Sequence, residues 1–276
     1  MFPLMLTLIG FMGPADSSPP VASADEPDPP VVRIVSRDFE FDLPARIPAG
    51  AVTFELTNEG PEPHHAWLVR LDGGHDLDDF LAAVEGDRGK TPEWAIDMGG
   101  PMVMMTPGAV SNATIDMKPG RYAFVCHVPS PDGISHLAKG MAKEFIVEES
   151  ATAPVEMPTP DVTVDLVDYA FVFMSPLRPG KQKVLFTNSS PQTHELVLWR
   201  LGEGAHVDDL IAWVFNMEGP PPGSVVGGVS GIAHGVENLV ELDLPTGRYA
   251  ATCFVPDAGD GAPHTDHGMK VEFEVK

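Results

Sequence analysis

The stretch GRYAFVCHVPSPDGISHLAKGM, from Gly120 to Met141, contains one of the two cysteines of this 276-residue chain. A second copy, GRYAATCFVPDAGDGAPHTDHGM, runs from Gly247 to Met269 and contains the other. In each copy a histidine follows the cysteine after a loop rich in Pro, Gly and Asp, and a methionine follows that histidine with four residues between them. A thiolate, an imidazole and a thioether form a soft ligand set that suits copper. The stretch therefore predicts a metal site that still lacks a second imidazole.

The two copies belong to a repeat that covers most of the chain. HHAWLVRL (64–71) matches HELVLWRL (194–201) at a spacing of 130 residues, and the spacing falls to 127 at the GRY motif. Many further matches in one register indicate a tandem duplication of a unit of roughly 110 residues.

The repeat supplies the missing imidazole. His64 and His194 align, each at the start of an apolar strand. Side chains alternate between the two faces of a strand, so His64 is predicted to face inward and its neighbour His65 outward, like the aligned Glu195. The same alternation turns Cys126, at the end of its strand, into the interior.

Short apolar runs with turn signals, one short helical pattern in each half and no alternation of strands with helices predict an all-β chain. We expect two tandem Greek-key β-sandwich domains built from antiparallel sheets, at 31–150 and 161–276, each with one short helix. The helices are expected at DLDDFLAAVEG (76–86) and DDLIAWV (208–214). The Pro-rich segment 151–160 between the domains is expected to be a linker.

Residues 1–30 are expected to lie outside the folded domains. They begin with an apolar run and contain the small-residue triplet Ala22-Ser23-Ala24, which resembles the cleavage site of a secretory signal peptide, although no Lys or Arg precedes Arg33. The following Pro- and acid-rich residues are typical of a disordered tether. We expect export to the periplasm or the extracellular space. No other stretch approaches a transmembrane span.

The charge balance limits the partners. There are 17 Lys and Arg against 40 Asp and Glu, which gives a net charge of −23. Such a charge opposes binding to nucleic acid or anionic membranes and favours docking to a basic partner, although a solvated acidic surface is the simpler interpretation. In an exported protein two cysteines suggest a disulfide, but here they occupy equivalent positions in two repeats. Two separate thiols, each with a local role, fit better.

A histidine on an early strand, the motif GxYxxxC and a loop to H-x4-M resemble the cupredoxins, the blue-copper family. The resemblance covers nearly the whole chain apart from the N-terminal segment and the linker. It implies up to two type 1 copper sites that cycle between Cu(I) and Cu(II), single-electron transfer and a redox partner protein. The implied ligands are His64, Cys126, His136 and Met141 in the first domain, and His194, Cys253, His264 and Met269 in the second.

One departure concerns the loop between cysteine and histidine, which has nine residues in the first half and ten in the second. Small electron-transfer cupredoxins are usually tighter here, and the longer loop looks more like the type 1 domain of copper nitrite reductases. We expect a longer loop to hold the ligands less rigidly. A catalytic copper of the nitrite reductase kind would require a histidine directly before the cysteine, where Val125 and Thr252 stand. His127 directly follows Cys126 and is interpreted as an outward polar residue rather than a ligand of a second metal.

The sequence therefore favours an electron carrier that is not itself an enzyme. The alternatives are a protein that sequesters or delivers copper without redox turnover, a nitrite-reductase-like copper enzyme, and a metal-free adhesive sandwich. The methionine cluster at 98–105 could bind Cu(I), although packing beneath the core is its simpler role.

Overall fold

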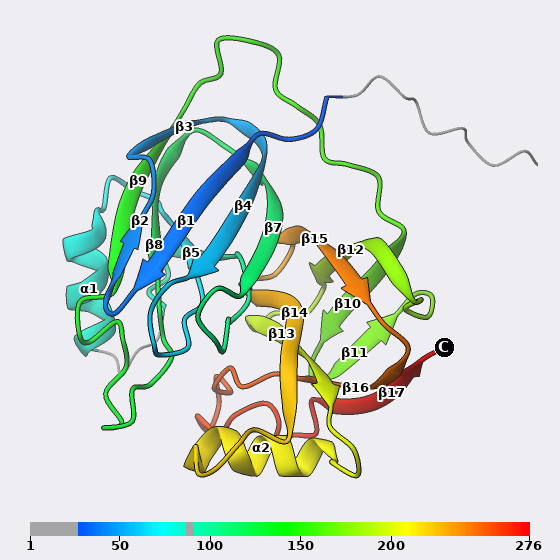
Figure 1. Ribbon diagram of the computed structural model, residues 1–276. Helices are drawn as coiled ribbons and strands as arrows, with labels where there is room; N and C mark the ends of the chain where they lie inside the picture. Colours follow the sequence, from blue (N-terminus) through cyan, green and yellow to red (C-terminus); the bar gives the residue numbers. More distant parts are fainter. Residues whose placement is uncertain (1–26, 87–90) are drawn as a thin grey trace, which may run out of the picture.

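The computed structural model describes residues 27–86 and 91–276 (Figure 1). The apolar, signal-like segment expected near the N-terminus lies outside these residues. Within them, neither helix has the length and apolar character needed to cross a membrane.

In the first half, the described residues form nine strands and one helix. They are β1 (Val31–Arg37), β2 (Glu40–Asp42), β3 (Arg46–Pro48), β4 (Gly50–Asn58), β5 (Trp67–Leu71), α1 (Leu77–Gly86), β6 (Ala95–Gly99), β7 (Val110–Met117), β8 (Gly120–Val125) and β9 (Ala142–Glu148). The helix confirms the one predicted for this half, and β6 lies in a Gly- and Met-rich stretch for which no strand was predicted.

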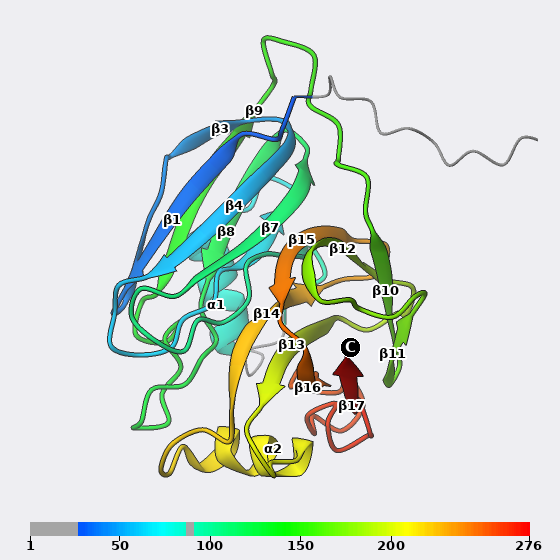
Figure 2. The same cartoon turned by 45° about the vertical axis from the view of Figure 1, so that its right-hand side comes forward.

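The second half repeats this order with eight strands and one helix. They are β10 (Val162–Val167), β11 (Ala170–Phe173), β12 (Gly180–Asn188), β13 (His194–Leu201), α2 (Val207–Asn216), β14 (Gly223–Ile232), β15 (Glu237–Leu244), β16 (Gly247–Thr252) and β17 (Lys270–Val275). The chain between β9 and β10 passes along the outside of the first half (Figure 2). There the Ala51 N–H donates to the Val155 carbonyl over 2.9 Å.

Two sheets run through both halves of the chain. One has the order β11-β10-β12-β15-β7-β4-β1-β2, and the other β17-β16-β13-β14-β6-β5-β8-β9-β3. Most neighbours are antiparallel, as expected. The pairs β1 with β4, β10 with β12 and β3 with β9 are parallel, which corrects the expectation of purely antiparallel sheets. In each half the first strand forms an antiparallel hairpin with the edge strand, β1 with β2 and β10 with β11. The chain then returns on the other side of the first strand, where β4 and β12 run parallel to it.

The strands alternate as their sequence requires, and the core lies between the two sheets. Phe54 and Phe124 project into it from opposite sheets and meet edge to face at 5.2 Å. The outer face of the β5–β8 sheet is also covered, because Phe80 and Val84 of α1 pack there against Val69. A sheet buried on both faces explains why β5 and β8 are apolar at nearly every position.

The two halves are joined at the edges of both sheets. Thr114 of β7 pairs with Leu239 of β15, and Met98 of β6 pairs with Ile232 of β14. Asn238, which is fully buried, accepts a hydrogen bond from the Gly100 N–H and donates to the Met98 carbonyl, so one side chain closes the gap between the sheets. Joining two half-sandwiches in this way leaves fewer open sheet edges.

We predict that Asn238→Ala lowers the free energy of unfolding of the whole chain. The Gly100 N–H and the Met98 carbonyl would lose their partner inside the protein, at roughly 1–3 kcal/mol for each group. Asn112→Ala is the matched control, since Asn112 also bridges the halves, to the Glu241 backbone, but through water-exposed hydrogen bonds. Denaturant unfolding should show a much smaller loss for the control. Equal losses would mean that burial of the Asn238 contact does not stabilise the junction.

Candidate metal centres

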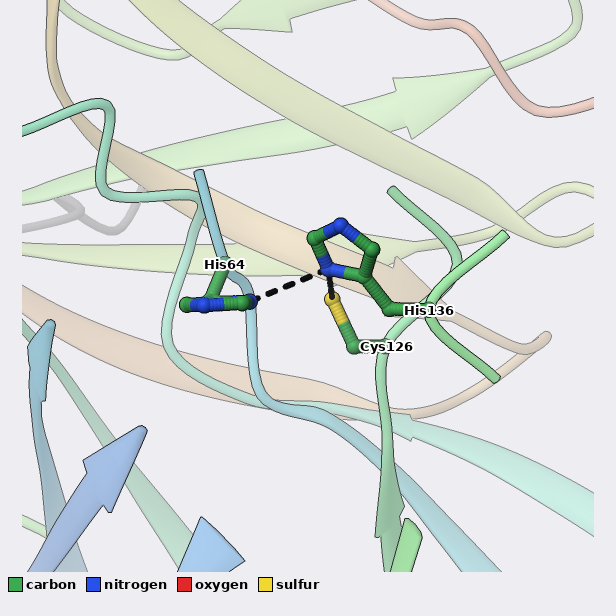
Figure 3. A group of neighbouring side chains, drawn as sticks. All are labelled: His64, Cys126 and His136. Atoms are coloured by element: carbon green, nitrogen blue, oxygen red, sulfur yellow. Dashed lines mark hydrogen bonds between the residues drawn. The ribbon is translucent and has the colours of Figure 1, made fainter. Parts of the chain in front are cut away.

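Three side chains of the first half meet inside the sandwich. His64 precedes β5, Cys126 directly follows β8, and His136 lies in the loop between β8 and β9. All three are fully buried, and their ligand atoms lie within 4.8 Å of one another. His136 Nδ1 is 3.0 Å from His64 Nδ1 and 3.4 Å from Cys126 Sγ (Figure 3). The structure thus brings together the thiol and the two imidazoles that were expected to form a site here.

The second half contains an equivalent group. His264 Nδ1 is 3.0 Å from His194 Nδ1 and 3.4 Å from Cys253 Sγ. The three residues are again fully buried. Both cysteines are free thiols, so the expectation of two separate thiols is confirmed.

The two methionines expected as axial ligands are fully buried beside the cysteines, within the same hydrophobic core. In the first half the Cys126 N–H donates to the Met141 carbonyl and the Met141 N–H to the His136 carbonyl. The corresponding bonds join Cys253, Met269 and His264. One backbone arrangement therefore holds cysteine, histidine and methionine together in each half.

The long loop between cysteine and histidine is pinned close to its ligands. The His136 N–H donates to the Val128 carbonyl over 2.9 Å, and an isolated bridge pairs Pro129 with Ser135. In the second half a bridge pairs Pro256 with Pro263. The extra residues form a closed tip beyond these bridges. That a longer loop holds the ligands less rigidly stays a prediction.

Carboxylates hold the outward nitrogens of the imidazoles. Asp38 accepts a hydrogen bond from His64 Nε2 over 2.7 Å, and Glu62 accepts one from His136 Nε2 over 2.9 Å. Asp168 binds His194 Nε2 in the same way over 2.6 Å. The sequence analysis assigned Asp38 and Asp168 no role. Their spacing of 130 residues, equal to that of the histidines, is the signal that could have found them.

These carboxylates decide where the imidazole protons sit. A proton on Nε2, shared with a carboxylate, leaves Nδ1 with an unprotonated lone pair. The Nδ1 atoms of His64 and His136 then face each other at 3.0 Å, next to a sulfur, in a site without water access. Burial lowers the pKa of His64, which keeps this ring neutral. A cation among the three donor atoms would relieve the repulsion between the lone pairs.

The thiols are protonated as long as no cation is bound. Burial raises the pKa of Cys126 to about 12, against hydrogen bonds from the backbone N–H groups of His65 and Val128 that lower it. Burial also raises the pKa of Cys253 far above its usual range. A metal ion that binds a thiolate must therefore displace one proton at each site, so its affinity rises with pH.

The geometry fits a transition-metal ion of the size of copper or zinc. With nitrogen ligands at roughly 2.0 Å and sulfur at roughly 2.3 Å from a metal, neighbouring donors are expected about 3–4 Å apart. The observed separations of 3.0 and 3.4 Å lie in this range in both halves. A set of one thiolate, two imidazoles and an adjacent thioether favours copper among the metals of this size.

The surroundings of the two groups differ at the second histidine. Gln192 stands where the first half has Glu62, and it binds the Tyr169 hydroxyl and the Ala258 N–H instead of a site histidine. Among residues 27–86 and 91–276, His264 Nε2 consequently has no hydrogen-bond partner, and the nearest carboxylate oxygen, of Asp257, is 4.0 Å away.

Two residues expected to point outward are buried. His65 is 5% exposed and Glu195 is 6% exposed. Strand alternation correctly places them on the face opposite the ligands. That face is also covered by other parts of the protein, so the two side chains are not exposed to solvent. Each receives a backbone hydrogen bond from the residue after the cysteine: the His127 N–H donates to His65 Nε2, and the Phe254 N–H donates to Glu195 Oε1, both over 2.9 Å.

His127 itself is half-buried and packs edge-on against Trp67. No potential metal-ligating group among residues 27–86 and 91–276 includes it. Asp257, Asp260 and His267 form a third, largely exposed cluster, in which the carboxylates already accept hydrogen bonds from their own loop.

Solved structures with a related fold include copper proteins. Auracyanin A, a "blue" copper protein from Chloroflexus aurantiacus, is 18% identical, with 44% of this chain and 100% of that chain covered at a TM-score of 0.31. Auracyanin from Roseiflexus castenholzii is 22% identical, with 43% and 96% covered at a TM-score of 0.29. Copper nitrite reductase from Nitrosomonas europaea is 15% identical, with 89% and 93% covered at a TM-score of 0.24.

No family model matches the sequence, and no curated protein matches it either. The solved structures named above are 15–22% identical to this chain, with TM-scores of 0.24–0.31. At such low identities and TM-scores they do not decide what this chain binds, and its chemistry has to be inferred from its own side chains.

We predict that Glu195 makes the metal-free protein less stable as the pH rises. Burial raises the pKa of this carboxyl to about 7, whereas the unfolded chain ionises it at its ordinary value of 4.5. Between these two pH values the folded state holds the extra proton, so the free energy of unfolding falls with pH, by about 3 kcal/mol in all. Glu195→Gln keeps an acceptor for the Phe254 N–H but cannot ionise.

The measurement is urea unfolding of the metal-free chain and of Glu195→Gln at several pH values between 4 and 8, a range chosen to bracket the transition. The stability of the variant relative to the natural chain should rise across the window. Parallel pH profiles would contradict the assignment of a buried, protonated carboxyl.

Proposed function

We propose that this chain is an exported copper protein with two type 1-like centres that transfers single electrons. The observation that carries the proposal is the convergence of one thiol and two imidazoles, fully buried, at equivalent positions of both halves. Bound copper would supply a Cu(I)/Cu(II) couple at each centre. The proposed ligands are His64, Cys126, His136 and Met141 in the first half, and His194, Cys253, His264 and Met269 in the second.

The rest of the chain fixes the positions of these donor atoms and shields them from solvent. Asp38 and Asp168 orient the early histidines, and the backbone bonds around each cysteine hold the later histidine and the methionine. A site whose donors cannot rearrange imposes nearly the same surroundings on both oxidation states. That lowers the reorganisation needed when one electron arrives or leaves, which suits an electron carrier.

Electron transfer is favoured over catalysis because every proposed ligand is fully buried. An electron can reach a buried centre through the protein, whereas a substrate must touch the metal. Delivery of copper would likewise call for accessible ligands, and Met102 and Met104 of the methionine cluster are buried at 1% and 4% exposure.

We further propose that residues 31–150 and 161–276 are two Greek-key, cupredoxin-like domains joined by a linker at 151–160. Residues 1–30 would comprise the export signal and an acidic tether. The net charge of −23 favours a basic redox partner.

We predict that the purified chain binds two copper ions and develops an intense thiolate-to-copper absorption in the visible range. Cys126→Ser and Cys253→Ser should each retain one copper with this absorption, and the double variant neither. Copper analysis and visible spectroscopy measure both quantities. Tight Cu(I) binding without the absorption would favour the copper-delivery alternative, and a third copper bound through His127 would favour an enzyme. Absorption that survives in the double variant would rule out the proposed centres.

We also predict that the carboxylate beside His136 strengthens metal binding in the first half. Glu62→Gln copies the situation of the second half, and loss of such an outer partner typically weakens affinity roughly 10–100-fold. Competition titration with Cu(I), in a Cys253→Ser background, isolates the first centre. Gln192→Glu in a Cys126→Ser background is the reciprocal variant and should leave the second centre unchanged or tighter. Unchanged affinity in Glu62→Gln would show that this hydrogen bond does not tune the site.

A further inference from the structure

A chain of contacts leads from a proposed ligand of the first half to a proposed ligand of the second. Cys126 is followed by His127, whose ring lies edge-on to the Trp67 ring with 5.1 Å between centroids. The Trp67 Nε1–H donates to Asp97 Oδ1 over 2.9 Å. The Thr193 hydroxyl donates to Asp97 Oδ2, also over 2.9 Å, and Thr193 directly precedes His194.

We propose that His127, Trp67, Asp97 and Thr193 form the route by which an electron passes between the two copper centres. This inference rests on the proposed function. Beyond the covalent steps at its two ends, the route has one aromatic contact and two hydrogen bonds. The electronic coupling for tunnelling falls less steeply with distance through covalent bonds and hydrogen bonds than across through-space gaps. Such a path therefore couples the two sites. One electron leaves Cu(I) at one centre and reduces Cu(II) at the other, with no proton transferred and no bond formed or broken.

Trp67 packs directly against the second half, at Gly231 of β14. A Cβ atom on Gly231 would lie 1.9 Å from Cζ2 of the indole, so only glycine lets the ring approach the β14 backbone this closely. The Asp97 carbonyl accepts a hydrogen bond from the Ala233 N–H over 2.9 Å, which holds the end of β14 beside β6. Trp67 is 8% and Asp97 5% exposed, so the middle of the route is shielded from water, whereas His127 and Thr193 on either side are half-buried.

These residues do not belong to the general plan of the repeat. Val197 and Phe254 occupy the positions equivalent to Trp67 and His127, and Pro63 the position equivalent to Thr193. Gly100 and Gly228 approach the equivalent carbonyls of Ala66 and Leu196, so these two glycines correspond. Counting back three residues from each, Val225 of β14 corresponds to Asp97. The second half forms the equivalent strands without Trp, Asp and His at these positions, so the fold of a half does not require the polar and aromatic set. It occurs once, at the junction of the halves.

The experiment measures the rate of electron transfer between the two centres in the copper-loaded full chain. A Met269→Gln background changes the axial ligand of the second centre and so separates the two centres in potential and spectrum. Pulse radiolysis then adds less than one electron per chain. The phase whose rate does not depend on protein concentration reports intramolecular transfer.

Three variants in this background separate a route from mere packing. Thr193→Val removes the hydroxyl that links Asp97 to His194 and should slow the intramolecular phase several-fold. Thr193→Ser restores the hydroxyl and should restore the rate. Thr91→Val is the matched control, because the Thr91 hydroxyl also donates to Asp97, over 3.1 Å, but lies off the route. The control should keep the reference rate.

Thermal unfolding of the metal-free variants provides a second readout, and Thr193→Val and Thr91→Val should lose similar stability. An unchanged rate in Thr193→Val, an equal slowing in Thr91→Val, a failure of Thr193→Ser to restore the rate, or the absence of any concentration-independent phase would overturn the route. Fewer than two coppers in the reference protein would instead overturn the proposed function.

Discussion

The close approach of two unprotonated imidazole nitrogens to a buried thiol is the constraint on which the molecule depends. At 3.0 Å two such lone pairs repel, and because the rings are fully buried, bulk solvent does not screen them. The carboxylates of Asp38 and Asp168 enforce this arrangement, since each occupies the Nε2 side of the early histidine. Folding thus brings electron-rich donor atoms together with no positive charge between them, and a bound cation would remove their repulsion. The second half repeats the close approach of two imidazoles and a thiol, although there only His194 has a carboxylate partner, and two such donor groups are explained most simply by two metal ions.

The joined sheets give the two centres a fixed relation. Because both sheets continue from one half into the other, the halves share hydrogen bonds, buried side chains and the Asn238 bridge. A loosely tethered pair of domains would change the separation of its centres continually. Here β6 and β14 meet in one ladder, and that contact brings Trp67, Asp97 and Thr193 together. The junction that stabilises the chain is therefore also the place where the two centres can communicate.

The repeat made the proposed ligands predictable, because a cysteine and the histidines recurring in one register are visible without a structure. The outer partners were harder to foresee. Asp38 reaches His64 only after the β1–β2 hairpin folds over, and Glu62 contacts His136 across a loop. The burial of His65 and Glu195 was missed because alternation assumes one wet face, whereas this sheet is covered on both. β6 was not predicted because the glycines and methionines in and after it obscure the strand pattern. Asp97, which lies in β6, was therefore not singled out.

X-ray absorption at the copper edge of the loaded protein tests the central claim most directly, because it reports which atoms surround the metal. The account predicts one sulfur from a thiolate and two imidazole nitrogens around the average copper, with two coppers per chain. It also predicts that each single cysteine variant keeps one thiolate sulfur per bound copper, because the variant loses one copper together with its thiolate. A first shell of oxygen and nitrogen alone, with no short sulfur contact, would contradict it.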